Sequence, residues 1–139
     1  MEIRDVMTQN PRTVGPGDSI QRAAGIMKEA DTGFVPIVEN GKVVGVVTDR
    51  DIVVRAVAAG SYDRPVSEIA TRDLVSVAPG DSTQRAEELM SDRQVRRVAV
   101  VEEGRLVGIV SLGDLAVKEG NDGRAGATLE NISEGVKKR

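Results

Sequence analysis

The chain contains neither cysteine nor histidine. Without cysteine it has no disulfide, no thiolate nucleophile and no cysteine-ligated zinc site. Without histidine it lacks the commonest general base, the commonest ligand of transition metals and the usual sensor of pH near neutrality. Any metal would have to be a hard cation such as magnesium, held by carboxylates. Because the sequence also offers no nucleophile–base pair and no glycine-rich phosphate loop, we expect it not to be an enzyme.

Aromatic side chains are almost missing as well, since Phe34 and Tyr62 are the only two. Proteins that bind single-stranded nucleic acid stack bases on aromatic side chains, and two are too few for such a platform. The net charge of −3 also disfavours binding to a phosphate backbone. No apolar run is long enough to span a bilayer, and the N-terminus has no signal-peptide pattern. We therefore expect a cytoplasmic protein that contacts neither nucleic acid nor membrane.

What the sequence does contain is one pattern that occurs twice. A shift of 63 positions places residues 14–19, Val-Gly-Pro-Gly-Asp-Ser, on residues 77–82, Val-Ala-Pro-Gly-Asp-Ser. The same shift aligns Asp51 with Asp114, and it needs no gap. A repeat of this kind indicates two copies of one supersecondary unit, so a site in one copy is expected to have a counterpart in the other.

The 139 residues divide at this repeat. We expect a first repeat over residues 1–60, a second over 61–119, and a linker with a C-terminal tail over 120–139. Residues 128–132 of the tail have the pattern of a short helix, and the tail is expected to be partly disordered. A domain of about 60 residues buries too little surface to be stable alone, so the two halves should pack on each other.

Each repeat has the pattern β-α-β-β-α, which predicts an α+β fold. In the first repeat, Ser19 is a helix N-cap before apolar residues spaced at i, i+3, i+4 and i+7. Two apolar segments on either side of Asn40-Gly41 predict a tight hairpin, and the second of them, 43–47, indicates a strand buried on both faces. The predicted elements are strands 12–14, 34–38 and 43–47 with helices 20–27 and 48–59, then strands 74–77, 98–101 and 105–110 with a helix capped by Ser82 and a helix over 112–118.

The repeated motifs resemble the cystathionine-β-synthase (CBS) domain pair, also called a Bateman module. The resemblance covers about residues 1–119, and it is closest to short stand-alone prokaryotic members. The residues that carry it are Val6-Met7-Thr8, Pro16-Gly17-Asp18-Ser19, Val35-Pro36-Ile37-Val38 and Gly45-Val46-Val47-Thr48-Asp49-Arg50-Asp51-Ile52 in the first repeat, with Gln94-Val95-Arg96-Arg97-Val98-Ala99-Val100-Val101 and Gly108-Ile109-Val110-Ser111-Leu112-Gly113-Asp114-Leu115 in the second.

The resemblance implies a fold and a function. Two repeats pack by pseudo-two-fold symmetry and leave clefts that bind adenosine-containing ligands such as AMP, ADP or ATP, or S-adenosylmethionine, and two modules form a homodimer. The chain is then a regulatory module that needs no cofactor for catalysis and signals in trans to an unknown protein. An alternative is an interaction module that dimerises without a ligand.

Two short motifs are the candidate ribose and phosphate sites. Thr48 and Asp51 begin one predicted helix, and Ser111 and Asp114 begin its counterpart. A carboxylate can accept hydrogen bonds from both hydroxyls of a ribose, and a hydroxyl at a helix N-terminus suits a phosphate. In the family these residues have those roles. The same spacing is also that of a capping box, in which the side chains only close the helix start.

The two copies differ where the hairpin begins. Arg96 and Arg97 of the second repeat align with Gly33 and Phe34 of the first. In nucleotide-binding relatives a basic pair here faces the phosphates, so the second cleft is expected to favour an anionic ligand. The alternative is that both arginines are solvated rim residues. The first cleft has Arg50 and Arg12 as nearby charges, and it either prefers a neutral adenosyl group, binds weakly or stays empty.

The adenine slot is expected to come from the first strand and the hairpin start of each repeat. The same residues are equally suited to the hydrophobic core. In the second repeat Ala99 stands where the first has Pro36, which would leave that slot wider. Asp49 and Asp51 are unsuited to holding magnesium together, because side chains two apart on a helix diverge. The adenine candidates are Thr13, Val35 and Pro36 in the first repeat and Val75, Ser76 and Val95 in the second.

Overall fold

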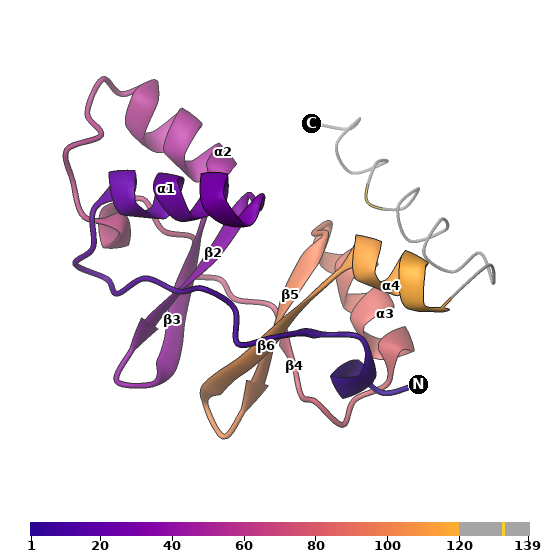
Figure 1. Ribbon diagram of the computed structural model, residues 1–139. Helices are drawn as coiled ribbons and strands as arrows, with labels where there is room; N and C mark the ends of the chain where they lie inside the picture. Colours follow the sequence, from indigo (N-terminus) through magenta and orange to yellow (C-terminus); the bar gives the residue numbers. More distant parts are fainter. Residues whose placement is uncertain (120–131, 133–139) are drawn as a thin grey trace. The chain divides into compact units, whose positions relative to one another are not determined.

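The structure is a computed structural model that describes residues 1–119 and Ile132 (Figure 1). The predicted linker at 120–126 and the predicted helix at 128–132 lie outside the described residues, Ile132 excepted. Among the described residues, no helix has the length and apolar character needed to cross a membrane.

The chain forms two compact units, and each takes a short segment from the sequence of the other repeat. The first-repeat unit comprises Pro11–Leu74 with Gly104–Leu106, and the second-repeat unit comprises Met1–Asn10, Val75–Glu103 and the chain from Val107. Residues 1–10 therefore belong with the second repeat, where Ile3 N donates to Asp81 O at 2.9 Å. Residues 61–74 belong with the first, where Val66 N donates to Asp18 O at 2.8 Å.

The first-repeat unit is an antiparallel hairpin with helical segments before and after it. In Figure 1 the helices lie beside the end of the hairpin that is remote from its turn. Strands β2 and β3 pair so that Phe34 lies opposite Thr48 and Val35 opposite Val47. The elements are α1 (Ile20–Ala30), β2 (Phe34–Glu39), β3 (Lys42–Thr48), α2 (Asp49–Asp51), η2 (Ile52–Val57) and η3 (Val66–Glu68).

The second-repeat unit repeats this plan. Strand β4 runs parallel to β5, β6 lies on the other side of β5, and β1 pairs antiparallel with β6. The α+β class and the tandem repeat predicted from the sequence are confirmed. The elements are η1 (Ile3–Asp5), β1 (Thr8–Gln9), β4 (Ser76–Val77), α3 (Thr83–Arg93), β5 (Arg97–Glu102), β6 (Arg105–Ser111) and α4 (Leu112–Glu119).

Helix starts and hairpin turns follow the local sequence. Ser19 Oγ accepts a hydrogen bond from Arg22 N at 3.0 Å, and Ser82 Oγ accepts from Arg85 N at 3.2 Å, so both predicted N-caps are confirmed. Asn40 and Gly41 have φ values of 53° and 80°. Two successive positive φ values define the type I′ turn that Asn-Gly favours in a two-residue hairpin.

The helix predicted over residues 48–59 differs in type from the observed one. After the short α2, the chain continues as the π-helical η2, in which Ala58 N donates to Val53 O at 2.9 Å. Ile52, Val53 and Val54 are all β-branched, and their branches crowd an α-helical turn, which favours the wider π spacing. The wider turn keeps Ala56 buried and leaves Val53, Val54 and Val57 between 51% and 58% exposed.

Three strand predictions were too long or too buried. The strand predicted over 74–77 is limited to β4, Ser76–Val77. Residues 12–14 contribute only an isolated parallel bridge between Val14 and Ile37, with Val14 N donating to Pro36 O at 3.0 Å. In β3, residues 45–47 are buried in succession, which places both faces of that stretch in the interior. Val44 is 38% exposed, so the prediction of a strand buried throughout 43–47 is wrong at its beginning.

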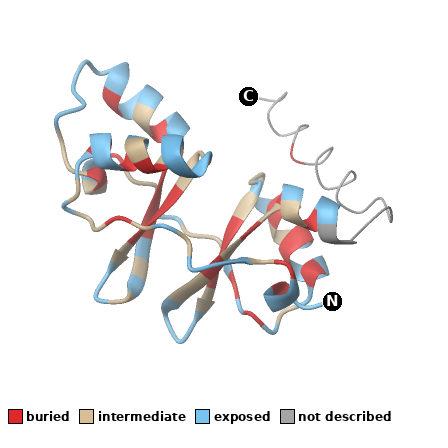
Figure 2. Ribbon diagram, in the orientation of Figure 1, coloured by how far each residue is buried: buried red, intermediate tan, exposed pale blue. Residues whose placement is uncertain are grey.

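Each unit has a hydrophobic core of its own. Figure 2 shows buried positions along the strands and helices of each unit and exposed positions at the hairpin turns. The first-repeat core contains Val14, Ile20, Ala23, Ile26, Val35, Ile37, Val47, Ala56, Val66 and Ile69. The second-repeat core contains Ile3, Val6, Val77, Ala86, Met90, Val98, Val100, Val110, Leu112, Leu115 and Ile132.

Candidate functional site

The Thr48–Asp51 motif closes the start of α2. Thr48 Oγ1 accepts from Asp51 N at 3.1 Å, and Thr48 N donates to Asp51 Oδ2 at 3.0 Å. These reciprocal bonds make a capping box. Asp51 is only 6% exposed. The structure therefore places both predicted residues together, with the carboxylate turned toward its own backbone.

Asp51 has further partners that the sequence analysis did not identify. Thr71 Oγ1 donates to Asp51, at 3.1 Å from each carboxylate oxygen. Arg55 Nε lies 3.8 Å from Asp51 Oδ1. Thr71 is the counterpart of Thr8 under the 63-residue shift, so the sequence repeat already aligned these two threonines. Nothing in the sequence indicated that its hydroxyl bonds to Asp51.

The Ser111–Asp114 motif forms the equivalent cap at the start of α4. Ser111 Oγ accepts from Asp114 N at 3.0 Å, and Ser111 N donates to Asp114 Oδ2 at 3.1 Å. Both residues are half-buried. Among residues 1–117, whose side chains the structure describes, the backbone N–H of Ser111 is the only hydrogen-bond donor to this carboxylate. That bond uses Oδ2, and Oδ1 accepts from none of these residues.

Arg96 and Arg97 lie next to that cap. Leu112 N donates to Arg96 O at 2.9 Å, which joins the start of α4 to the start of β5. Arg96 is exposed and Arg97 half-buried, and among the side chains of residues 1–117 neither is in an ion pair. The structure thus places the backbone of this basic pair next to the residue that follows Ser111, and positive charge there would favour an anionic group.

The first-repeat unit has the same backbone link with the opposite charge. Asp49 N donates to Gly33 O at 3.0 Å. A Cβ atom at Gly33 would lie 2.6 Å from Asp49 Oδ2, so the carboxylate covers the glycine. An acid therefore stands here where the second-repeat unit has Arg96. The predicted difference in charge between the two sites rests on Asp49 as well as on the arginines.

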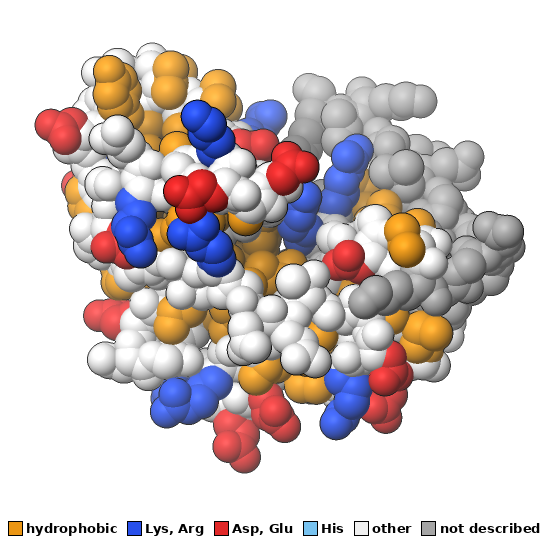
Figure 3. All heavy atoms as spheres, in the orientation of Figure 1, with side chains coloured by type: hydrophobic (Ala, Val, Ile, Leu, Met, Phe, Trp, Pro, Cys, Tyr) orange, Lys and Arg blue, Asp and Glu red, His pale blue; other side chains and the backbone are white. Residues whose placement is uncertain are grey.

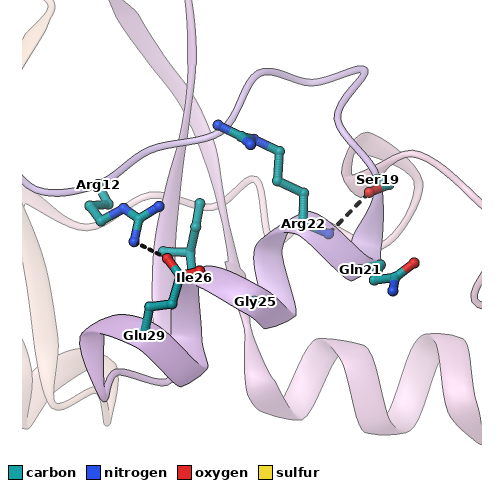
Figure 4. A pocket seen from close by; sticks show the side chains of 7 residues that line it. All are labelled: Arg12, Ser19, Gln21, Arg22, Gly25, Ile26 and Glu29. Carbon is teal, nitrogen blue, oxygen red and sulfur yellow. Dashed lines mark hydrogen bonds and ion pairs between the residues drawn. The ribbon is translucent and has the colours of Figure 1, made fainter.

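Arg12 is paired with an acid of α1, whereas Arg50 directly precedes Asp51. Arg12 Nη1 is paired with Glu29 Oε2, across a hollow of about 330 Å³ along α1 (Figure 4). The guanidinium of Arg12 is thereby held at α1. Arg50 is exposed at the start of α2, directly before Asp51.

The adenine candidates of the first repeat are mostly core residues. Val35 is fully buried and belongs to the first-repeat core. Pro36 is buried too, and its carbonyl accepts from Val14 N. Thr13 is half-buried next to that bridge. The three residues lie together where the chain before α1 meets β2.

Those of the second repeat lie at β4 and β5. Val75 O accepts from Ala99 N at 3.1 Å, and Ser76 pairs with Ala99 in the parallel register. Ser76 is exposed, whereas Val75 and Val95 pack against the second-repeat core. The structure thus brings Val75 and Ser76 together at the edge of β5.

No candidate metal cluster occurs among the described residues. Asp49 Oδ1 accepts from Arg50 N at 2.9 Å, while the Asp51 carboxylate faces Thr48 and Thr71. The two acids therefore bind different groups, as the spacing predicted.

Known proteins match the whole repeated region. CBS domain-containing protein YhcV of Bacillus subtilis is 45% identical over 132 residues, which is 94% of each chain. A crystal structure of Hypoxic Response Protein I with two coordinated zinc ions has a TM-score of 0.77 at 36% identity, and covers 84% of this chain and 98% of that one.

The CBS domain pair of protein MJ0100, solved in complex with 5′-methylthioadenosine and S-adenosyl-L-methionine, has a TM-score of 0.79 at 30% identity. That match covers 86% of this chain and 96% of MJ0100's solved pair. The sequence model of the CBS domain matches this chain twice, over residues 3–57 and 66–118. The chain therefore belongs to the CBS domain family and carries two CBS domains in tandem.

Proposed function

We propose that this protein is a regulatory module that binds an adenosine-containing ligand and signals the bound state to a separate protein. The ligand class is that of AMP, ADP, ATP and S-adenosylmethionine. The proposal is supported by MJ0100, whose CBS domain pair was solved with two adenosyl ligands. Asp114 accepts the ribose hydroxyls, Ser111 and the N-terminus of α4 receive the phosphate, and the arginines at β5 neutralise it.

The observation that carries the proposal is the arrangement at Ser111. A carboxylate whose helix cap uses one oxygen, a hydroxyl and two arginines that form no ion pair with the side chains of residues 1–117 come from the adjoining starts of α4 and β5. Each of these groups matches one part of a nucleotide. A cap that served only the helix would need Ser111 and Asp114, but it would not need the two arginines.

A homodimer is the second part of the proposal. Hydrophobic side chains gather over η2 in Figure 3, where Val53, Val54 and Val57 are 51% to 58% exposed. Beside them lies an open hollow of about 760 Å³ between α1 and η2, lined in part by Ile20, Ala24 and Ile52. Contiguous apolar surface of this kind is typical of protein interfaces.

The alternative function is an interaction module that uses this apolar surface and binds no ligand. One observation favours it. Both candidate aspartates accept hydrogen bonds from their own helix starts, which is what a purely structural cap would do. In that case the homodimer would form without any response to nucleotides.

Thermal unfolding with AMP, ADP, ATP, S-adenosylmethionine, NAD and cyclic dinucleotides separates the two functions. A ligand at 100 times its Kd adds about 2.7 kcal/mol to the free energy of unfolding. For a domain of this size that raises Tm by a few degrees. We expect AMP to raise Tm, Asp114→Ala to abolish that rise and Asp51→Ala to weaken it less. The same panel with Gly17→Ala, an open position, controls for the effect of mutation itself.

Equal losses from Asp114→Ala and Asp51→Ala would show that the second-repeat unit does not hold the better site. A wild-type Tm that none of these ligands changes would contradict ligand binding and would leave the interaction module as the function.

A further inference from the structure

We propose that the hydroxyl of Thr71 competes with the ribose diol for Asp51 and keeps the first-repeat site closed. This inference rests on the proposed function and adds to it how many of the two candidate sites bind a ligand. The chain then binds one adenosyl ligand, at Asp114, while the acid of the first repeat is occupied by the protein's own side chain.

Asp51 presents little open surface to a ligand. Its Oδ2 accepts from Thr48 N, and the Thr71 hydroxyl lies at 3.1 Å from both carboxylate oxygens, in the bridging position that a ligand hydroxyl would need. Arg55 Nε adds an opposite charge at 3.8 Å, and the residue is 6% exposed. A ribose would have to displace Thr71 before its two hydroxyls could bond to this acid.

Thr71 is held in place by hydrogen bonds of its backbone. Val46 N donates to Thr71 O at 2.9 Å, and Thr71 N donates to Val46 O at 2.8 Å. A Cβ atom at Gly45 would lie 3.1 Å from Thr71 O, so the glycine permits the close approach. Arg55 Nη1 donates to Ile69 O at 3.3 Å and to Ala70 O at 3.1 Å. These hydrogen bonds fix residues 69–71, and with them the Thr71 hydroxyl, next to Asp51.

The second-repeat unit has the same backbone pairing at the equivalent threonine, but it lacks the hydrogen bond from that threonine to the acid. Thr8 pairs with Ile109 as Thr71 pairs with Val46, and a Cβ at Gly108 would lie 2.8 Å from Thr8 O. Thr8 is exposed, and among residues 1–117 Asp114 accepts from Ser111 N and not from Thr8. The two sites therefore differ in whether the threonine at this position bonds to the acid.

Removing the Thr71 hydroxyl should open the first site. Thr71→Val has nearly the same volume and keeps both backbone hydrogen bonds, but it cannot donate to Asp51. A buried acceptor that loses its donor gains by accepting from a ligand instead. We expect adenosine to bind the first site of Thr71→Val at least about tenfold more tightly than that of the wild type, because a hydrogen bond to a charged group no longer has to be broken.

The experiment is isothermal titration calorimetry with adenosine, whose lack of phosphate removes the preference for the arginines at β5. We expect one equivalent per chain for the wild type and two for Thr71→Val. Thr8→Val is the matched control at the equivalent position, and it should keep one equivalent. Thr71→Ser restores a hydroxyl and should return to one. The probe 2′-deoxyadenosine has no vicinal diol and should not fill the second equivalent.

The identity of the new site is tested by Thr71→Val combined with Asp51→Ala, which should return to one equivalent. Circular dichroism verifies folding, and if Thr71→Val does not fold, Arg55→Gln, which loosens the same segment, replaces it with the same expectation. Two equivalents in the wild type, or one equivalent in a folded Thr71→Val, would overturn the competition while leaving ligand binding at Asp114 intact. Adenosine and AMP binding to neither protein would overturn the proposed function together with this inference.

Discussion

At the scale of single residues, the candidate site depends on carboxylates that have two possible roles. Asp51 and Asp114 each hold the first turn of a helix by accepting from a backbone N–H three residues earlier. A cap of this kind contributes about 0.5–2 kcal/mol to stability. The capping function uses only one oxygen of Asp114, so capping and ligand binding are compatible there. At Asp51 the Thr71 hydroxyl lies at 3.1 Å from both oxygens and the residue is 6% exposed, so a ligand would have to displace that hydroxyl.

The arginines beside Ser111 give the site its expected preference for charged ligands. We expect Arg96→Ala and Arg97→Ala each to weaken AMP binding by about tenfold, since a hydrogen bond between two charged groups contributes about 1.5–3 kcal/mol. Binding of adenosine should change less than twofold, because it has no phosphate. Calorimetry with both ligands measures the difference.

Arg50→Ala is the matched control for these variants, because Arg50 is an exposed arginine at the start of the other helix. It should leave the ratio of the AMP and adenosine affinities unchanged. Equal losses of AMP and adenosine affinity in Arg97→Ala would contradict a phosphate contact and would indicate a role in shaping the site.

The sequence predicted which residues come together at each site, because the repeat and the capping-box spacing are local patterns. Thr48 with Asp51 and Ser111 with Asp114 are three residues apart, so a single helix turn is enough to join them. Thr71 was missed for the opposite reason, whereas Arg55 is only four residues from Asp51 and was overlooked although its spacing is local. Thr71 lies 20 residues from Asp51 and reaches it only because the chain returns to pair with Val46.

At the scale of secondary-structure elements, predictions were accurate where a side chain or a turn fixes the backbone. Ser19 and Ser82 cap their helices, and Asn40-Gly41 forms the expected hairpin turn. The π-helical η2 was not predicted, because the apolar spacing of residues 48–59 fits an α-helix equally well. What separates the two is crowding between β-branched side chains in the folded helix, and that crowding depends on packing.

The close approach of β1 to β6 gives an element-scale prediction. A Cβ atom at Gly108 would lie 2.8 Å from Thr8 O and 2.8 Å from Met7 Sδ. Because the oxygen belongs to the backbone, the two strands would have to separate. We expect Gly108→Ala to lower the free energy of unfolding by about 1–3 kcal/mol, the usual cost of overpacking. Chemical denaturation measures it.

Gly25→Ala is the control for that measurement. Gly25 is in α1, and a Cβ atom there would meet nothing within 4 Å. Alanine is the better helix former, so this variant should be more stable by about 0.5–1 kcal/mol. A Gly108→Ala protein as stable as the wild type would show that β1 can shift without cost.

At the scale of the whole molecule, sequence repeats and compact units have different boundaries. Residues 1–10 complete the second-repeat unit, and residues 61–74 complete the first-repeat unit. The second repeat thereby supplies the segment that carries Thr71 to Asp51, the acid of the first repeat. The sequence could not show this exchange, because residues 1–10 and 61–74 have similar patterns and either segment would fit either repeat. Two units that exchange segments cannot be cut apart at residue 60 without removing part of each.

The apolar surface of η2 gives the prediction for assembly. We expect the wild-type chain to have twice the mass of the 14.8 kDa monomer in light scattering, since Val53, Val54 and Val57 would otherwise remain in water. Val54→Asp places a charge within this surface and should yield the monomer mass, because an unpaired charge at an interface is costly.

Val117→Asp is the matched control, because Val117 is the counterpart of Val54 in α4 and is itself 81% exposed. Because the proposed contact includes the hollow beside η2, Val117→Asp should keep the mass of the dimer. A monomeric wild type would contradict the homodimer. A monomer produced by Val117→Asp but not by Val54→Asp would place the contact on α4 instead, and a monomer produced by both would require the two helices to take part together.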